Sequence, residues 1–162
     1  STAHLLLELI KQRTGANLVH IPYKGAGPAL VGVMGGQTPM DLVGVVGVPQ
    51  HINAGTLHAI AISSARRSKL LPNVPTVAES GFTDLVFNSW NGIVAPSKTP
   101  RPIIARLSSE LNAALTDPSV RERLEAIGFD SVAGTPSSFA EQIRGDLARY
   151  GQVVKAAGMK AE

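Results

Sequence analysis

The 162-residue sequence contains no cysteine. This absence excludes disulfides, thiolate nucleophiles and cysteine-bound metals, and it leaves the redox compartment open. Charged residues make up 17% and aromatic residues 4% of the chain, and the largest basic group is Arg66, Arg67 and Lys69. Because nucleic-acid-binding surfaces carry larger basic patches, commonly with aromatic side chains among them, the sequence predicts no nucleic-acid partner.

Long apolar runs are lacking as well. None approaches the ~18 residues that span a bilayer. The first residues are not a basic segment followed by an apolar one, so the sequence predicts no signal peptide in this chain. The hydrophobic residues, 44% of the chain, are enough to bury a globular core. Because Ser1 and Thr2 cap a helix with nothing before them, we expect a piece cut from a longer protein.

The first part of the sequence alternates between extended apolar runs and short helical runs. The opening residues carry the apolar stripe of a helix, which is closed by Gly15. The later pattern predicts helices at 28–34 and 49–54, and strands at 18–22, 40–46, 57–63 and 130–133. Such alternation predicts an α/β fold, in which a parallel sheet with right-handed crossovers is flanked by helices.

Helix-capping signals are clear features of the sequence. Thr76 and Glu79 have the spacing of a capping box for one short helical turn. Further along, the predicted helix N-caps are Thr99, Asp117 and Thr135, each followed closely by proline. These signals predict three helices in the last third of the chain.

The sequence divides near residues 88–92. Residues 1–88 are predicted to form a nearly complete α/β domain, and residues 89–162 a crossover strand with a helical tail that lacks the sheet it should cover. The tail carries two apolar stripes, which are Ile104, Leu107, Leu111 and Leu115, and Phe139, Ile143, Leu147, Tyr150 and Val154. Because soluble monomers seldom expose so much apolar surface, we expect these stripes to pack against a partner that is missing here or against a second copy of the chain.

The turn Tyr-Lys-Gly-Ala-Gly-Pro, at 23–28, lies between a predicted strand and a predicted helix. In a parallel sheet the helices that follow the strands begin at one edge, where free N–H groups and the positive ends of the helix dipoles attract anions. Gly25 and Gly27 would let a ligand approach the backbone closely. We therefore expect the turn to converge with residues 1–2 and 43–48 on an anion-binding edge.

Simpler explanations apply to the same residues. The two glycines could serve only a tight turn, and Lys24 is more often a solvated side chain than a ligand contact. Trp90 is the single tryptophan; it could be buried against the core or form the wall of a cleft.

Motifs for catalysis and cofactors are missing from the sequence. The segment GAGPAL has Leu30 where a dinucleotide-binding fingerprint needs its third glycine, and neither a phosphate-binding loop nor a Gly-x-Ser-x-Gly elbow is present. The histidines show no metal-ligand spacing; they are His4, His20, His51 and His58. The sequence therefore predicts no cofactor, no metal and no catalytic residue.

Five segments carry a resemblance to a known family. They are VHIPYKGAGPALVGVMGGQ, HINAGTLHAIAISSARRS, LPNVPTVAESG, SWNGIVAPSKTP and VKAAGMK. Together they resemble the extracytoplasmic solute receptors of the tripartite tricarboxylate transporter system, also called the Bug family. The resemblance implies a periplasmic binding protein of the Venus-flytrap, type II-like kind, which captures a small organic carboxylate for a membrane permease. The chain resembles the C-terminal half of such a two-domain receptor. The resemblance therefore implies that residues 1–88 are the second domain without its first strand, and that the helical tail packs on the missing N-terminal half.

The resemblance also implies which residues bind the ligand. Residues 1–4 match the end of a Gly-Ser-x-x-His-Leu segment whose hydroxyl and N–H groups hold a carboxylate. Together with the residues expected at the anion-binding edge and at the wall of a cleft, the expected ligand-binding set is Ser1, Thr2, Tyr23, Lys24, Gly25, Gly27, Val43, Gly44 and Trp90. Family members often carry an aromatic-Asp pair where this chain has residues 42–44, and Asp41 comes too early to replace it. This difference favours a plain mono- or dicarboxylate, or an aromatic acid, over an amino acid.

The sequence is compatible with three functions. A receptor that binds a carboxylate without catalysis is favoured, because no nucleophile and base pair is visible. The alternative is a domain of an α/β enzyme that acts on an anionic small molecule. A third is a structural or sensory domain that binds a protein partner without a ligand.

Overall fold

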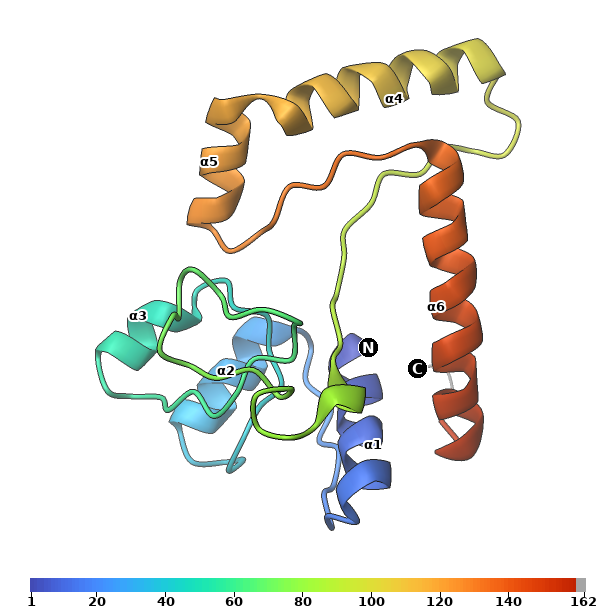
Figure 1. Cartoon of the computed structure of the whole chain (residues 1–162). Helices are drawn as coiled ribbons and strands as arrows, with labels where there is room; N and C mark the ends of the chain where they lie inside the picture. The colour runs from blue at the N-terminus through green and yellow to red at the C-terminus, as the bar shows by residue number, and fades with distance from the viewer. Residues whose placement is uncertain (160–162) are drawn as a thin grey trace. The chain divides into compact units, whose positions relative to one another are not determined.

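The computed structural model describes residues 1–159 and divides the chain into two compact units (Figure 1). The first unit contains Ser1–Ser89 together with the chain from Gln152, and the second contains Trp90–Gly151. This division falls within the predicted boundary at 88–92. The assignment of the two parts to particular domains of a receptor stays a prediction.

In the first unit, helix α1 spans Thr2–Thr14 and is the helix predicted from the opening stripe. Ser1 caps it, because its Oγ accepts a hydrogen bond from the backbone N–H of His4 at 3.3 Å. Gly15 ends it in the left-handed conformation, with φ 69°, which favours glycine. The first predicted helix is therefore confirmed at both ends.

The core of the first unit lies along α1. Its buried apolar side chains are Leu6, Leu7, Leu71, Leu85, Phe87 and Val153. The short 3-10 helix η1, Thr83–Leu85, contacts α1 and contributes Asp84, whose Oδ2 lies 2.7 Å from Arg13 Nε. Apolar burial and this exposed ion pair together hold the loop at 80–89 against α1.

Two short helices follow α1. Helix α2 spans Ala26–Met34 and helix α3 spans Val48–Asn53, so both lie within two residues of the predicted ranges. Glycines precede both helices, at Gly25 with φ 105° and Gly47 with φ 76°, conformations that strain other residues. The β-carbon-free backbone at these positions lets each extended segment turn sharply into its helix.

The predicted parallel sheet is not formed by the chain as described. Segments 18–22, 40–46, 57–63 and 130–133 pair into no ladder within residues 1–159, and 40–46 is an irregular segment that ends in a turn. The isolated parallel bridge that is present joins Ile62 to Thr76, with Ile62 N–H donating to Pro75 O at 2.8 Å.

The physical reason is that a strand needs the N–H and C=O groups of a neighbour, and the apolar pattern alone does not supply one. The residues of these runs are also exposed to solvent: Val19 and Ile60 are each 76% exposed. The expectation of a sheet contained within this chain is therefore corrected: the β-type pattern is present, but partners for it are not among residues 1–159.

In the second unit, helices α4 and α5 span Arg101–Thr116 and Pro118–Ala126. Helix α6 spans Pro136–Ala156, and its last turns belong to the first unit. The cap prediction is confirmed at Asp117, whose carboxylate accepts from two N–H groups of α5, and at Thr135, whose Oγ1 accepts from Ser138 N–H at 3.0 Å.

The N-cap predicted at Thr99 is wrong. Helix α4 begins after Pro100, which occupies the cap position and offers no side-chain acceptor. The hydroxyl of Thr99 is one residue too far upstream, and its backbone N–H instead donates to Pro96 O at 3.0 Å in a preceding turn. The proline-rich start supplies a preset φ angle, so the helix begins without a hydroxyl cap.

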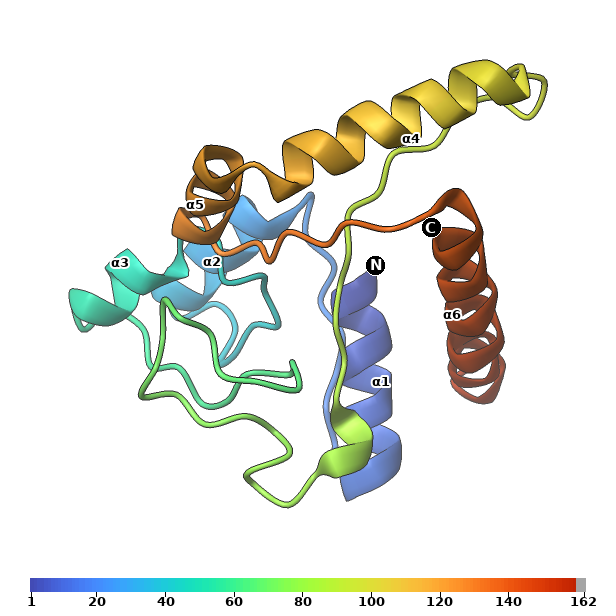
Figure 2. The same ribbon diagram turned by 45° about the horizontal axis from the view of Figure 1, so that its top comes forward.

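Residues 127–135 run back along α4 (Figure 2). Asn112 of α4 holds this segment through two hydrogen bonds: its Nδ2 donates to Gly134 O at 2.9 Å, and its Oδ1 accepts from Gly134 N–H at 2.8 Å. The apolar stripes of the second unit stay partly open, with Leu107 46% and Leu147 69% exposed. Among residues 1–159, no helix combines the length and the apolar character needed to cross a membrane.

Candidate functional site

The first turn of α1 presents backbone N–H groups next to two exposed hydroxyls. Ser1 and Thr2 are both exposed, and Ser1 Oγ is already the acceptor for His4 N–H. The helix has no internal acceptor for the N–H groups of Thr2 and Ala3, which lie in the first turn. This end of α1 therefore offers donors and a positive dipole to an anion.

The turn that leads into α2 presents a second set of donors. Gly25 N–H donates to Tyr23 O at 2.8 Å, and no side chain caps α2. The N–H groups of Ala26 and Gly27 lie in its first turn, where the helix supplies no acceptor. A β-carbon at Gly27 would meet no described atom within 4 Å, so a ligand has open access to this backbone. Lys24 is exposed beside the turn.

The turn geometry requires glycine at one of the two positions and not at the other. Gly25 adopts φ 105°, so the turn itself requires glycine there. Gly27 has neither a positive φ nor a crowding neighbour, so turn geometry does not explain it. The role of Gly27 in the close approach of a ligand stays a prediction.

Tyr23 packs onto α2. The ring lies so close to Gly32 that a β-carbon there would be 2.8 Å from Tyr23 Cζ and closer still to its hydroxyl oxygen. Gly32 is buried and opens the helix surface for the ring. Sequence reasoning missed Gly32, because a tyrosine and a glycine nine residues apart give no periodic signal.

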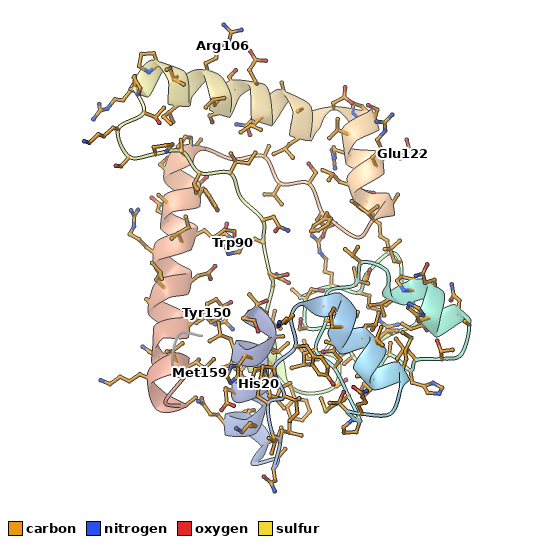
Figure 3. The ribbon with its side chains drawn as sticks, turned by 180° about the vertical axis from the view of Figure 1, so that it is seen from behind. His20, Trp90, Arg106, Glu122, Tyr150 and Met159 are labelled. Atoms are coloured by element: carbon orange, nitrogen blue, oxygen red, sulfur yellow. The ribbon has the colours of Figure 1, made fainter. Side chains whose placement is uncertain are left out.

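The beginnings of α1 and α2 lie at the same end of the first unit, because residues 15–25 run back alongside α1 (Figures 1 and 2). The rings of His4 and His20 confirm this arrangement, since they stack with centroids 3.8 Å apart and planes 13° apart. Figure 3 shows His20 beside α1. The structure thus brings the predicted caps at 1–2 and the predicted turn at 23–27 to one end of the unit.

A charged group lies next to the histidine stack. Glu8 is only 8% exposed, and its Oε1 is 2.8 Å from Lys11 Nζ and 3.8 Å from His4 Nε2. The ammonium group compensates the buried carboxylate, as a buried charge requires. The spacing of the histidines gave no metal site, and it gave no signal for the contact between His4 and His20. Within residues 1–159 no cluster of potential metal ligands is present.

Val43 and Gly44 lie before α3 in an irregular segment. Val43 is half-buried, and Gly44 is exposed with nothing within 4 Å of a β-carbon placed there. Asp41, just upstream, has a buried Oδ2 that finds no hydrogen-bond partner among the described residues. The participation of Val43 and Gly44 in the same site as residues 1–2 and 23–27 stays a prediction.

Trp90 belongs to the second unit and is 42% exposed, so its expected burial in the core is only partial. Its Nε1 donates to Asp146 Oδ2 at 2.6 Å, and its ring meets Phe139 edge to face with centroids 5.1 Å apart. Gly92 makes room for the Phe139 ring, which would clash with a β-carbon. Trp90 is thus held on α6, and its contact with a ligand stays a prediction.

The first unit offers first-turn N–H groups at the beginnings of α1 and α2, exposed hydroxyls and a glycine-containing turn, which are groups that bind anions. The chain belongs to the tripartite tricarboxylate transporter receptor family, whose family model matches residues 1–159. This membership confirms the predicted resemblance and places the chain among receptors rather than enzymes.

Relatives and solved structures agree with this family. Protein BugT of Bordetella pertussis is 41% identical over 160 residues, which are 99% of this chain and 49% of that protein. An R. palustris protein solved with adipate has a TM-score of 0.88 and 31% identity, covering 98% of this chain and 53% of that one. MatC from Rhodopseudomonas palustris with bound malate has a TM-score of 0.81 and 28% identity, and the match covers 95% of this chain and 53% of that one.

The structure of the periplasmic binding protein BugD is also similar, with a TM-score of 0.79 and 28% identity over 99% of this chain and 54% of that one. The chain therefore spans about half the length of the relatives named above. These likenesses show the fold of part of a periplasmic solute-binding protein.

Proposed function

We propose that the protein containing this chain captures a small organic carboxylate and delivers it to a tripartite tricarboxylate-type permease in the membrane. The observation that carries the proposal is the fold: it matches one receptor solved with adipate and another solved with malate. The family and its periplasmic members support a periplasmic location for this protein too.

The proposed site uses the beginnings of α1 and α2. A carboxylate would accept hydrogen bonds from N–H groups in the two first turns and from the hydroxyls of Ser1 and Thr2, with both helix dipoles favouring the negative charge. The open space at Gly27 lets the carboxylate reach the backbone. Val43 and Gly44 would complete this side of the site.

The domain assignment belongs to the same proposal. Residues 1–88 form the second, ligand-binding domain, and residues 89–162 cross to and cover the first domain. The half-open apolar stripes support this reading, since Leu107 and Leu147 are 46% and 69% exposed. The extended runs near residues 18–22 and 57–63 would find their strand neighbours in a longer chain.

The ligand is proposed to be a plain carboxylate rather than an amino acid. Residues 42–44 are Leu, Val and Gly, so these positions offer no acidic side chain that could bind an ammonium group. A positively charged amino group would lose its hydration on binding, and without a carboxylate or other acceptor in the site no new interaction would compensate that loss.

Titration calorimetry on the full-length protein tests the proposal. The ligands are adipate, malate, a monocarboxylate and a matched amino acid, and the expected result is saturable one-to-one binding of a plain carboxylate. Gly27→Ala should weaken that binding, because its methyl group occupies the approach to the backbone. Gly145→Ala is the matched control, since a β-carbon there also meets nothing within 4 Å but lies on α6.

The same mixtures, recovered after calorimetry, distinguish the receptor from the enzyme. Recovery of the carboxylate unchanged supports a receptor. Conversion of the carboxylate to a product would support the enzyme alternative, and binding of a permease or other protein without any carboxylate would support the sensory alternative. Failure of every carboxylate to bind would overturn the proposed function.

A further inference from the structure

Asn91 and Gly92 form an Asn-Gly pair in the extended segment that begins the second unit. Both residues are exposed and lie outside any helix. Their neighbour Trp90 lies next to α6, and Trp90 and Gly92 both meet the ring of Phe139 (Figure 3). Because alternate residues of an extended chain face opposite ways, the side chain of Asn91 is directed away from that ring, which agrees with its exposure.

The asparagines of the chain differ in whether the next backbone N–H is engaged. After Asn17, Asn53 and Asn73, this N–H donates to a carbonyl upstream, at 3.0, 3.0 and 3.1 Å respectively. After Asn112 it lies inside α4, where the helix supplies its acceptor. The N–H of Gly92, which follows Asn91, donates to no residue among 1–159. The Gly92 nitrogen is therefore free to react.

Asn88 is the other asparagine that precedes a free N–H within the described residues, that of Ser89. The β-carbon of Ser89 crowds its own nitrogen, whereas Gly92 has no β-carbon and a wider range of backbone angles. An exposed side-chain amide, a free neighbouring nitrogen and the absence of a β-carbon thus occur together at residues 91 and 92. Asparagine is among the thermally labile residues, and this combination favours its reaction with the backbone.

We propose that Asn91 is a site of spontaneous deamidation. The Gly92 nitrogen attacks the side-chain amide carbon of Asn91, and the new N–C bond closes a succinimide ring. The bond from that carbon to the amide nitrogen breaks, and ammonia leaves with the proton that Gly92 N–H gives up. Water from the solvent then opens the ring, so the net reaction exchanges ammonia for water without oxidation or reduction. One opening gives aspartate, and the other gives isoaspartate.

Isoaspartate would disturb the contacts with Phe139. Its main chain runs through the side-chain carbon, which adds one methylene group between Trp90 and Gly92. Trp90 meets the Phe139 ring edge to face with centroids 5.1 Å apart, and Gly92 lies against the same ring. The lengthened chain loses the fit of both residues on one ring, so the indole of Trp90 leaves its packed environment. This inference uses contacts within the second unit alone and does not depend on carboxylate binding.

The first experiment locates the reaction. The full-length protein is aged in mildly alkaline buffer and digested, and its peptides are sequenced by mass spectrometry. Asn91 should gain the mass difference between a hydroxyl and an amino group and give separate aspartyl and isoaspartyl forms. The internal control is Asn112, whose Nδ2 donates to Ser108 O at 2.8 Å and to Gly134 O at 2.9 Å. Because Asn112 must first unfold locally, it should react at least about tenfold more slowly.

Two results would overturn the site. One is an Asn91 that stays unmodified, as it would if a longer chain engaged the Gly92 N–H. The other is reaction at Asn88 or Asn112 as fast as at Asn91, because the free nitrogen and the missing β-carbon would then have no effect.

The second experiment tests the consequence by fluorescence, because Trp90 is the single tryptophan. Aged wild type should emit at longer wavelength than fresh protein, since the indole opens to water. Asn91→Gln should keep its emission on ageing, because its longer side chain would have to close a larger and less favourable ring. Asn91→Asp, measured fresh, carries the new charge on an unlengthened chain and should emit like fresh wild type.

These variants separate the possible causes. An equal shift in fresh Asn91→Asp would overturn the role of the lengthened chain, and so would an unshifted emission in aged wild type that contains isoaspartate. An equal shift in aged Asn91→Gln would show that ageing acts elsewhere in the protein and would also overturn it. Circular dichroism before and after ageing establishes that the comparison is made between folded proteins.

Discussion

Arg67 donates from Nε to both carboxylate oxygens of Glu79, each at 3.0 Å. Glu79 Oε2 also accepts from Thr76 N–H at 2.7 Å, and Thr76 Oγ1 accepts from Glu79 N–H at 3.1 Å. The predicted capping box at residues 76 and 79 is thus confirmed. The residues that it caps form a hydrogen-bonded turn and not the helical turn that was predicted. Arg67 extends the box with an ion pair that spacing alone did not predict.

These contacts predict an acid-sensitive turn. The hydrogen bond from Arg67, followed by that from the Thr76 backbone, lowers the pKa of Glu79 from 4.5 to about 2. A depressed carboxyl pKa stabilises the fold above the unfolded value, and this stabilisation is lost as the pH falls from 4.5 through about 2. NMR titration of the Glu79 side chain should give the lowered pKa in the wild type and a value closer to 4.5 in Arg67→Gln. An ordinary pKa in the wild type would contradict the ion pair.

A second prediction concerns Gly32. An alanine there would push its β-carbon into the Tyr23 ring, to 2.8 Å from Cζ, so Gly32→Ala should lower the free energy of unfolding by about 1–3 kcal/mol. Denaturant unfolding measures this loss. In a Tyr23→Ala background the same substitution should cost less, because the clashing ring is gone. Gly145→Ala, with nothing within 4 Å, should instead stabilise by about 0.5–1 kcal/mol. Equal effects at the two glycines would refute the packing of Tyr23 on α2.

The sequence predicted the helices well because their signals are local. A cap, an apolar stripe and a terminal glycine occur within one segment, as in α1 from Ser1 to Gly15. The sheet could not be predicted in the same way. Extended runs at 18–22 and 57–63 carry the β-type pattern, but pairing depends on a neighbour that the pattern does not specify.

The candidate site shows the same limit. The donors at the beginnings of α1 and α2 were predictable, because a cap and a Gly-x-Gly-Pro turn are local features. Contacts between distant residues were not, since the stacking of His4 on His20 and the hydrogen bond from Trp90 to Asp146 bridge segments far apart in sequence. Only the folded chain brings such pairs together.

A third prediction compares two threonines that have similar sequence contexts. Thr135 caps α6 through a reciprocal pair, in which its Oγ1 accepts from Ser138 N–H and Ser138 Oγ accepts from Thr135 N–H, both at 3.0 Å. Thr135→Ala should lower the free energy of unfolding by about 0.5–2 kcal/mol. Thr99→Ala should change it by less than about 0.5 kcal/mol, because Thr99 caps nothing. Thermal and denaturant unfolding of both variants measure the difference, and equal losses would contradict the cap assignment.

The last prediction separates the two roles of Asp146. Burial first, and the negative charge of Asp146 second, raise the pKa of Tyr150 above 10.0, because both disfavour the phenolate. Asp146 also accepts the hydrogen bond from Trp90 Nε1 at 2.6 Å.

Asp146→Asn removes the charge but keeps an oxygen acceptor for the indole, whereas Asp146→Ala removes both. The pKa of Tyr150 should therefore fall toward 10.0 in both variants, measured by ultraviolet absorbance in a Tyr23→Phe background that leaves a single tyrosine. The fluorescence of Trp90 should shift to longer wavelength only in Asp146→Ala, because only there does the indole lose its acceptor and open further to water. An unchanged tyrosine titration in Asp146→Asn would show that burial alone raises the Tyr150 pKa, and an unshifted emission in Asp146→Ala would refute the anchoring of Trp90 on α6.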